Sequence, residues 1–372
     1  MPCVCVCVLQ DLNWLVPTDE TETCLSELRV LDASYNRLTA LHAGVLHRLQ
    51  RLQQLHLQGN WLVQVADNAL DGLVSLRLLN VAGNQLTSLP PALLAQTRQL
   101  QVRSRLCLSV SVCVCVCACS GLTVGRGVRP LQELYASANS LAVLAPGLLH
   151  GLDDLLVIDL SDNQLTSASL SGSQQTLHGL RHLAVLSLHN NRIQRLDAAL
   201  LQDLTALQIL RLDGNLIEAL PDGLLDGLAA LHTLILSRNR LTALQAGAVA
   251  GLQRLALLAL DNNLLERVDD QALANCTALR DLNLSGNYLA QVRRHSTCFP
   301  LRTRKKKQKS IDNKMKTTDH QVPAALRGLT RLQSLDLGEN RIQGFDADLL
   351  QGMDQLSSLR LLDNHVSDRL FA

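Results

Sequence analysis

The sequence predicts an α/β solenoid, in which about twelve repeats of 24 residues stack so that their short strands form one concave parallel sheet. The first observation behind this prediction is composition, because 47% of the residues are hydrophobic and only 2% are aromatic. Aliphatic side chains must therefore fill almost all of the core. The second observation is a repeated pattern, L-x-x-L-x-L-x-x-N-x-L, and the third is its nearly constant spacing.

The pattern occurs twelve times, for example as LQQLHLQGNWL ending at Leu62 and as LRDLNLSGNYL ending at Leu289. Its length and period are those of leucine-rich repeats, which form a horseshoe with the strands inside. Alternate leucines of each strand point into the core. Return segments such as GLLHGL, ALLQDL and GLLDGL supply the second apolar ridge. Neither half can bury its apolar face alone, so the repeats must stack.

One asparagine recurs in every repeat, at the point where the chain turns away from the strand. We expect its amide to satisfy backbone groups that the turn leaves unpaired, which is a structural role and not a catalytic one. This predicted ladder consists of Asn36, Asn60, Asn84, Asn139, Asn163, Asn191, Asn215, Asn239, Asn263, Asn287, Asn340 and Asn364.

Departures from the 24-residue spacing divide the chain. The 28-residue step from Asn163 to Asn191 predicts a longer surface loop. The steps of 55 residues to Asn139 and 53 residues to Asn340 predict two contiguous insertions, across which the repeats still stack. The predicted segments are a damaged repeat remnant that has lost its strand (1–24), repeats (25–100), a Cys/Val-rich insertion (101–130), repeats (131–292), a basic insertion (293–321) and repeats truncated without a C-terminal cap (322–372).

The first insertion contains LCLSVSVCVCVCACSG, and MPCVCVCV opens the chain. Since the codons TGT and GTG encode Cys and Val, translation of a TG dinucleotide repeat in a retained intron would produce such an alternating sequence. We interpret both insertions as retained introns or, if translated, as disordered loops.

Three alternatives to this interpretation remain open. Residues 106–125 are long and apolar enough for a membrane helix, which would however place adjoining repeats on opposite sides of a bilayer. The thiols of Cys113, Cys115, Cys117 and Cys119 could bind a soft metal, but their alternation differs from the usual C-x2-C spacing. The run RKKKQK resembles a nuclear or nucleic-acid-binding patch, although basic blocks are more often solvated.

Charge and motifs argue against catalysis. The chain has 34 Lys plus Arg and 33 Asp plus Glu, so no overall field favours nucleic acid or a membrane surface. Outside the insertions we find no glycine-rich phosphate loop, no metal-ligand cluster and no Ser/His/Asp set. We therefore expect no enzyme activity, no cofactor, no metal site and no small-molecule substrate.

Two features bear on location. Only Cys24 and Cys276 of the eleven cysteines belong to the repeats, so disulfides give no information about the compartment. The sequons NCT at Asn275 and NLS at Asn283 permit glycosylation if the chain is secreted.

The candidate binding surface is the concave face of the sheet, because the residues flanking the inward leucines point out of it. Their mixture of apolar and charged side chains suits a protein surface better than an enclosed pocket. The candidate partner-binding residues are Asp159, Ser187, His189, Ile209, Arg211, Asp213 and Ile235.

The succession LQILRLDGNLIEALPDGLLDGL, LANCTALRDLNLSGNYL and LDLGENRIQGF resembles the ectodomain of arthropod Toll-type receptors, especially the long Toll subfamily. The longer repeat after NQLTSA lies where those receptors also carry one. Where that family often has Phe, this chain has Leu or Val, at Leu149, Leu201, Leu225 and Val249.

The resemblance implies an internal fragment of a receptor ectodomain on the extracellular side of the plasma membrane, with a membrane span elsewhere in the parent protein. It also implies binding of a secreted cystine-knot cytokine or a partner ectodomain in innate immune or developmental signalling. Two other classes share the same repeats. They are a secreted or matrix adhesion protein and a cytoplasmic scaffold.

Overall fold

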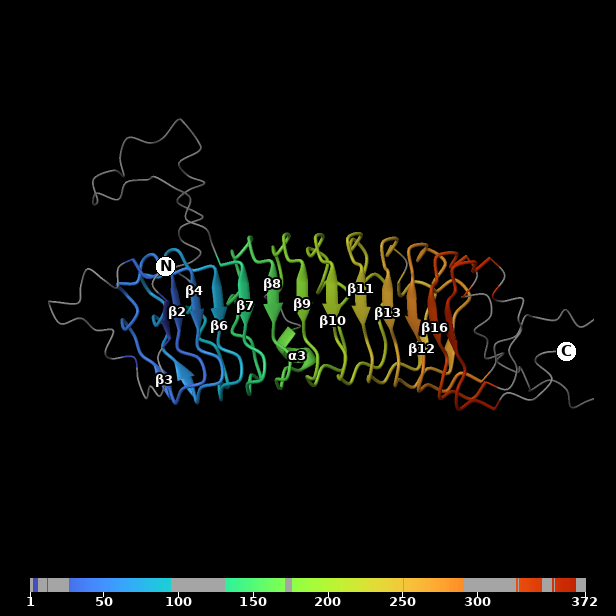
Figure 1. Ribbon diagram of the computed structural model, residues 1–372, viewed down its shortest axis with the longest axis horizontal. Helices are drawn as coiled ribbons and strands as arrows, with labels where there is room; N and C mark the ends of the chain where they lie inside the picture. The colour runs from blue at the N-terminus through green and yellow to red at the C-terminus, as the bar shows by residue number, and fades with distance from the viewer. Residues whose placement is uncertain are drawn as a thin grey trace, which may run out of the picture.

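The computed structural model describes residues 3–5, 12, 27–94, 131–170, 176–249, 251–290, 326, 328–342, 350 and 352–365. These residues form one solenoid, with the strands side by side along its long axis (Figure 1). Thirteen strands make one sheet in chain order, and every neighbouring pair is parallel. The predicted solenoid of leucine-rich repeats with a parallel sheet is confirmed.

Each strand of the main sheet has three residues. The strands are β1 (Cys3–Cys5), β2 (Val30–Asp32), β4 (Gln54–His56), β6 (Leu78–Asn80), β7 (Glu133–Tyr135), β8 (Val157–Asp159), β9 (Val185–Ser187), β10 (Ile209–Arg211), β11 (Thr233–Ile235), β13 (Leu257–Ala259), β15 (Asp281–Asn283), β16 (Ser334–Asp336) and β17 (Ser358–Arg360). Two small parallel sheets pair β3 (Ala40–Leu41) with β5 (Gln64–Val65), and β12 (Ala243–Leu244) with β14 (Arg267–Val268).

The first turn of the solenoid differs from expectation. β1 lies beside β2, with Val4 in register with Leu31, so the expectation that the N-terminal remnant has lost its strand is wrong. The alternating Cys and Val residues supply that strand instead of a leucine pattern. β-Branched valine favours extended backbone, which accounts for the substitution.

The core lies between the sheet and the return segments. The middle residue of nearly every strand is buried, as Leu210 and Leu234 illustrate, while its two neighbours are partly exposed. On the return side, Leu149, Leu201 and Val249 are also buried, so these smaller side chains fill the positions where the resembling family often has Phe.

The return segments of the described repeats are mostly turns. Their one helix is α3 (Ser167–Leu170), which lies in the expanded repeat between Asn163 and Asn191. The Ser169 hydroxyl holds the start of this helix, because it accepts a hydrogen bond at 2.8 Å from the amide of Thr166, the residue just before the helix. The sheet register is unchanged across the expanded repeat, with Ile158 opposite Leu186.

The asparagine of each repeat joins that repeat to the one before it. In Asn215, Oδ1 accepts from the Ile193 amide at 3.1 Å, while Nδ2 donates to the carbonyls of Leu188 and Leu212 at 2.9 and 3.0 Å. Asn60 and every later asparagine of the series make the same three contacts. The amide thus closes a turn and fastens two repeats together.

Both predicted insertions lie outside the described residues, and with them the proposed metal, membrane and nucleic-acid segments. The repeats that flank them stack directly, as expected. β6 pairs with β7, β15 pairs with β16, and the Leu86 amide donates to Asn139 Oδ1 at 3.1 Å.

Candidate protein-binding face

The outward side chains of β8, β9, β10, β11 and β13 form the candidate face. Because these strands are parallel and in register, equivalent residues lie in rows that cross the sheet. The first and third residues of β10 and β11 are partly exposed, and the middle residue is buried. The face therefore presents a regular array of half-buried side chains.

The structure brings the predicted residues together. Asp159, Ser187, Arg211 and Ile235 occupy one row on consecutive strands, and Ile209 lies in the adjacent row. Ser187 is buried and offers little surface to a partner. The others are partly exposed, so the surface combines charged and apolar character.

Most charges on this face already have partners within the chain. The Arg211 guanidinium contacts Asp213 through Nε–Oδ1 at 3.3 Å and Nη2–Oδ2 at 3.2 Å. Asp159 Oδ1 accepts from the Ser161 hydroxyl at 2.6 Å and from its amide at 3.1 Å. These contacts hold the side chains in fixed positions, which lowers the entropy that binding a partner would cost.

His189 is more covered than an outward strand position suggests. Its side chain is only 16% exposed, with Nε2 3.7 Å from Asp162 Oδ2. Nδ1 is buried and has no hydrogen-bond partner among the residues that the structure describes. His189 therefore adds little accessible surface to the face.

The sequence reasoning missed the contribution of β13. Leu257 and Ala259 continue the two rows described above, and Asp261 lies just beyond the strand. Asp261 Oδ1 accepts from the Ser237 hydroxyl at 2.5 Å and from Asn283 Nδ2 at 3.1 Å. The signal was present, because Asp261 holds the same position before Asn263 as Asp213 holds before Asn215.

A tyrosine and a glutamate mark the edge of the face at β7. The Tyr135 hydroxyl donates to Glu133 Oε2 at 3.0 Å. Burial and then this bond to the carboxylate raise the pKa of Tyr135 to about 12, so its proton stays in place at neutral pH.

The two predicted glycosylation sites differ in surroundings. Asn275 lies exposed in a turn on the return side. Asn283 lies in β15, where its Nδ2 donates to Asp261 and its Oδ1 accepts from the Ser285 hydroxyl at 2.8 Å. A glycan at Asn283 would remove these contacts and cover the face, whereas one at Asn275 would disturb neither.

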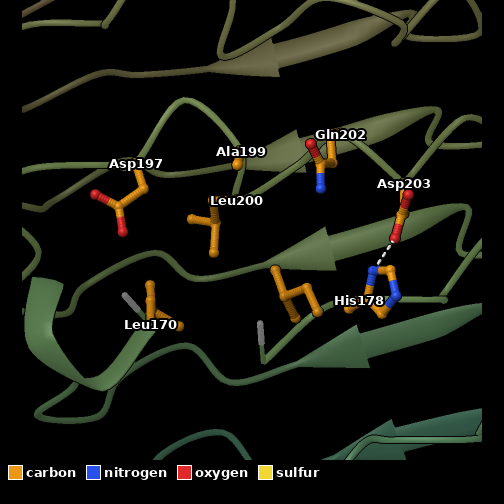
Figure 2. Close-up of a pocket in the computed structure, with 8 residues that line it drawn as sticks. Leu170, His178, Asp197, Ala199, Leu200, Gln202 and Asp203 are labelled. Carbon is orange, nitrogen blue, oxygen red and sulfur yellow. Dashed lines mark ion pairs between the residues drawn. The ribbon is translucent and has the colours of Figure 1, made fainter. Parts of the chain in front are cut away.

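A small pocket lies on the return side, beside the expanded repeat (Figure 2). Its volume is about 170 Å³, below the roughly 300–1,000 Å³ typical of small-molecule sites. His178 Nδ1 forms an ion pair with Asp203 Oδ2, which also accepts from the Gly179 amide at 3.1 Å. Leu170, Leu177 and Leu200 complete the wall. The pocket suits one side chain at most.

Within the described ranges, no three His, Cys, Asp or Glu side chains gather as metal ligands would. In the same part of the chain, no helix is long and apolar enough to cross a bilayer.

A family model described as leucine rich repeat matches residues 26–86, 170–217, 181–241, 229–289 and 322–366, which together exceed half of the chain. The chain belongs to the leucine-rich-repeat family. Among leucine-rich-repeat relatives, podocan-like protein 1 of Mus musculus is 34% identical over 143 residues, covering 37% of this chain and 24% of the relative. Lumican of Gallus gallus is 33% identical over 139 residues, covering 37% and 38%. Fibromodulin of Oryctolagus cuniculus is 31% identical over 162 residues, covering 44% and 99%.

The chain therefore spans less than half the length of the first two of these relatives. Among solved leucine-rich-repeat structures, the Toll–Spatzle complex of Drosophila aligns with a TM-score of 0.62 at 21% identity, over 93% of this chain and 42% of that one. An internalin of Listeria monocytogenes also gives 0.62, at 19% identity, over 92% and 77%. Such low identities show the shared fold alone.

Proposed function

We propose that this chain is a non-enzymatic protein-recognition module of an extracellular protein, and that it binds its partner through the face of β8 to β13. The observation that carries the proposal is the array of half-buried, internally fixed side chains on that face, with Ile209 and Ile235 beside Arg211 and Asp213. A wide, open sheet gives contact area without the enclosure that a small substrate needs.

The proposed partner is a secreted cystine-knot cytokine or a partner ectodomain, and the proposed parent is a receptor of the Toll type. The order of the repeats supports this reading. The likeness to lumican, fibromodulin and podocan-like protein 1 at 31–34% identity favours a second candidate, a secreted or matrix adhesion protein. Both candidates place the module outside the cell.

The first experiment tests location. When the full chain is expressed behind a secretion signal, we expect a glycan at Asn275, because its side chain is exposed in a turn. Mass spectrometry of the native protein from its source tissue then decides the compartment. An unmodified Asn275 in the native protein would favour the cytoplasmic scaffold instead.

The second experiment tests the binding face. The immobilised full chain is screened against a panel of purified cystine-knot cytokines and leucine-rich-repeat ectodomains, and each binder is measured again with Arg211→Glu plus Ile235→Asp. We expect affinity to fall at least about tenfold, since both a charge and a buried apolar contact are lost. Circular dichroism should not change, because neither side chain lies in the core.

The matched control makes the same chemical changes away from the face, as Arg254→Glu plus Leu264→Asp. Both positions are exposed. Equal affinities for the wild type and the face variant would move the site to another surface, such as the lateral edge where Arg341 stacks on Tyr288 at 4.2 Å.

A further inference from the structure

One row of outward residues on the face is almost entirely apolar. Register aligns Val157, Val185, Ile209, Thr233 and Leu257, the first residues of five consecutive strands. All five are partly exposed. With strands about 4.8 Å apart, the row is roughly 19 Å long. Such a row crosses the strands and follows the long axis of the solenoid (Figure 1).

The neighbouring row widens this apolar patch. Ile235 and Ala259 are the third residues of β11 and β13, so they lie beside Thr233 and Leu257 on the same face. Contiguous apolar surface of this kind marks a contact with another molecule more often than scattered exposed residues do.

Acidic residues bound the apolar row at both ends. Register places Glu133 of β7 next to Val157, and Asp281 of β15 next to Leu257. Asp159 and Asp261 lie along one side and are hydrogen-bonded to neutral serine and asparagine groups. The cation within the patch, Arg211, is held by Asp213. Outside the patch, exposed Arg280 precedes Asp281.

We infer that the partner contributes a segment with an apolar stripe and lysine or arginine residues at its flanks. The stripe covers the row from Val157 to Leu257, and the cations meet Glu133, Asp281, Asp159 and Asp261. A helix of about 13 residues has the length of the row at 1.5 Å per residue. This inference rests on the proposed function, since it names the chemistry of the partner of that same face.

The test uses two labelled 16-residue helical peptides with the same leucine stripe, one flanked by lysine and the other by glutamate. Fluorescence anisotropy with the full chain measures both affinities. We expect the lysine peptide to bind at least about tenfold more tightly, and salt to reduce the difference, because the flanking attraction is electrostatic.

Two double variants assign the contacts. Ile209→Ser plus Ile235→Ser should lower the affinity for the lysine-flanked peptide about tenfold. Glu133→Gln plus Asp281→Asn should reduce the preference for lysine over glutamate. The matched controls are Val63→Ser plus Val143→Ser, at valines 53% and 56% exposed outside this face, and Asp222→Asn plus Asp226→Asn, in an exposed turn.

Equal affinity for both peptides, no binding of either, or equal losses in the control variants would overturn the inference. The proposed function fails separately. If a protein from the panel still loses affinity with Arg211→Glu plus Ile235→Asp while neither peptide binds, the face recognises a protein of other chemistry. Circular dichroism of every variant verifies that the fold is retained.

Discussion

Each ladder asparagine from Asn60 to Asn340 bonds to three buried backbone groups at once, and this makes it costly to replace. In Asn215→Ala, the Ile193 amide loses its acceptor. The carbonyls of Leu188 and Leu212 each lose one of two side-chain donors, because Asn191 and Asn239 still donate to them. Leaving the buried amide unsatisfied costs about 1–3 kcal/mol and each lost hydrogen bond about 1 kcal/mol, so we expect a loss of about 3 kcal/mol in the free energy of unfolding. Urea denaturation followed by circular dichroism measures it.

Gln208→Ala is the matched control for that substitution. It removes an amide of similar size from an exposed position of the same repeat. We expect it to change stability by less than about 0.5 kcal/mol. Equal denaturation midpoints for the two variants would show that the ladder contributes little.

Cys276 gives the fold a dependence on alkaline pH. Burial raises the pKa of its thiol to about 11, against about 8.5 for an exposed thiol. The folded state therefore keeps this proton longer than the unfolded state does. The contribution of the protonated thiol to the free energy of unfolding is therefore complete below about pH 8.5 and decreases as the pH rises toward 11.

Cys276→Ala should remove that decrease. Urea midpoints of the wild type and the variant, measured from pH 7 to pH 10.5, should differ by a constant below pH 8.5 and converge above it. The constant is the cost of the small cavity. All other titrating groups are common to both proteins, so parallel curves throughout the range would contradict the prediction.

The residue that precedes each ladder asparagine shows where sequence reasoning ends. In all twelve repeats it has a positive φ, as at Gly214 (65°), Asp162 (53°) and Arg238 (56°). Eight of the twelve are Gly, Asn or Asp, which adopt left-handed backbone readily, but Tyr35, Ala138, Arg238 and Glu339 are not, so residue type predicts this conformation at only part of these positions. The bonds of the following asparagine compensate the strain, and they become visible only when the repeats are stacked.

The strands, in contrast, could be predicted from the leucine pattern alone. The outward positions follow from the period of two, which is why Asp159, Arg211 and Ile235 were found. What the pattern could not predict is how much neighbours cover each outward side chain. Ser187 and His189 are examples, because cover depends on the side chains of adjacent repeats and not on the residue itself.

At the scale of elements, three-residue strands hold only because their neighbours pair with them, and the first insertion does not interrupt this pairing. Deleting residues 101–131, which covers the insertion and Leu131, brings Leu100 to the buried position of Leu131 and restores the 24-residue spacing between Asn84 and Asn139. Since β6 and β7 already pair, we expect unchanged far-UV circular dichroism and a thermal midpoint no lower than that of the full chain.

A deletion placed within a repeat is the control. Removing residues 143–154 shortens one return segment and should destabilise the fold strongly, because buried Leu148, Leu149 and Leu152 are lost. A fall of more than about 5 °C in the midpoint of the 101–131 deletion would contradict the expectation that this segment is dispensable. A transcript lacking the corresponding bases would support the retained-intron interpretation.

At the scale of the whole molecule, a local loss of stability should affect only the adjacent turns, as in other linear repeat arrays. Leu134→Ala truncates a buried side chain in β7, at the junction that follows the first insertion. We expect hydrogen exchange to become faster in β6 and β8, while exchange in β13 stays unchanged, because only adjacent strands pair.

Exposed Val143→Ala lies in the same repeat and should leave exchange in all of these strands unaltered. If exchange in β8 rose and exchange in β6 did not, the blocks on either side of the insertion would be independent folding units. Uniform acceleration along the whole sheet would instead indicate a single cooperative unit.

Among the described residues, the side chain of Asn239 reaches back by one turn and no further, to Ile217, Leu212, Leu236 and Ser237. From Asn60 to Asn364, the connections between described repeats are therefore copies of one another, and none of them depends on the number of repeats. Gene duplication or loss of one complete unit would leave each remaining connection intact, whereas a change of a few codons inside the strand and its asparagine turn would break one. We expect paralogues to differ in length by complete repeats of the solenoid.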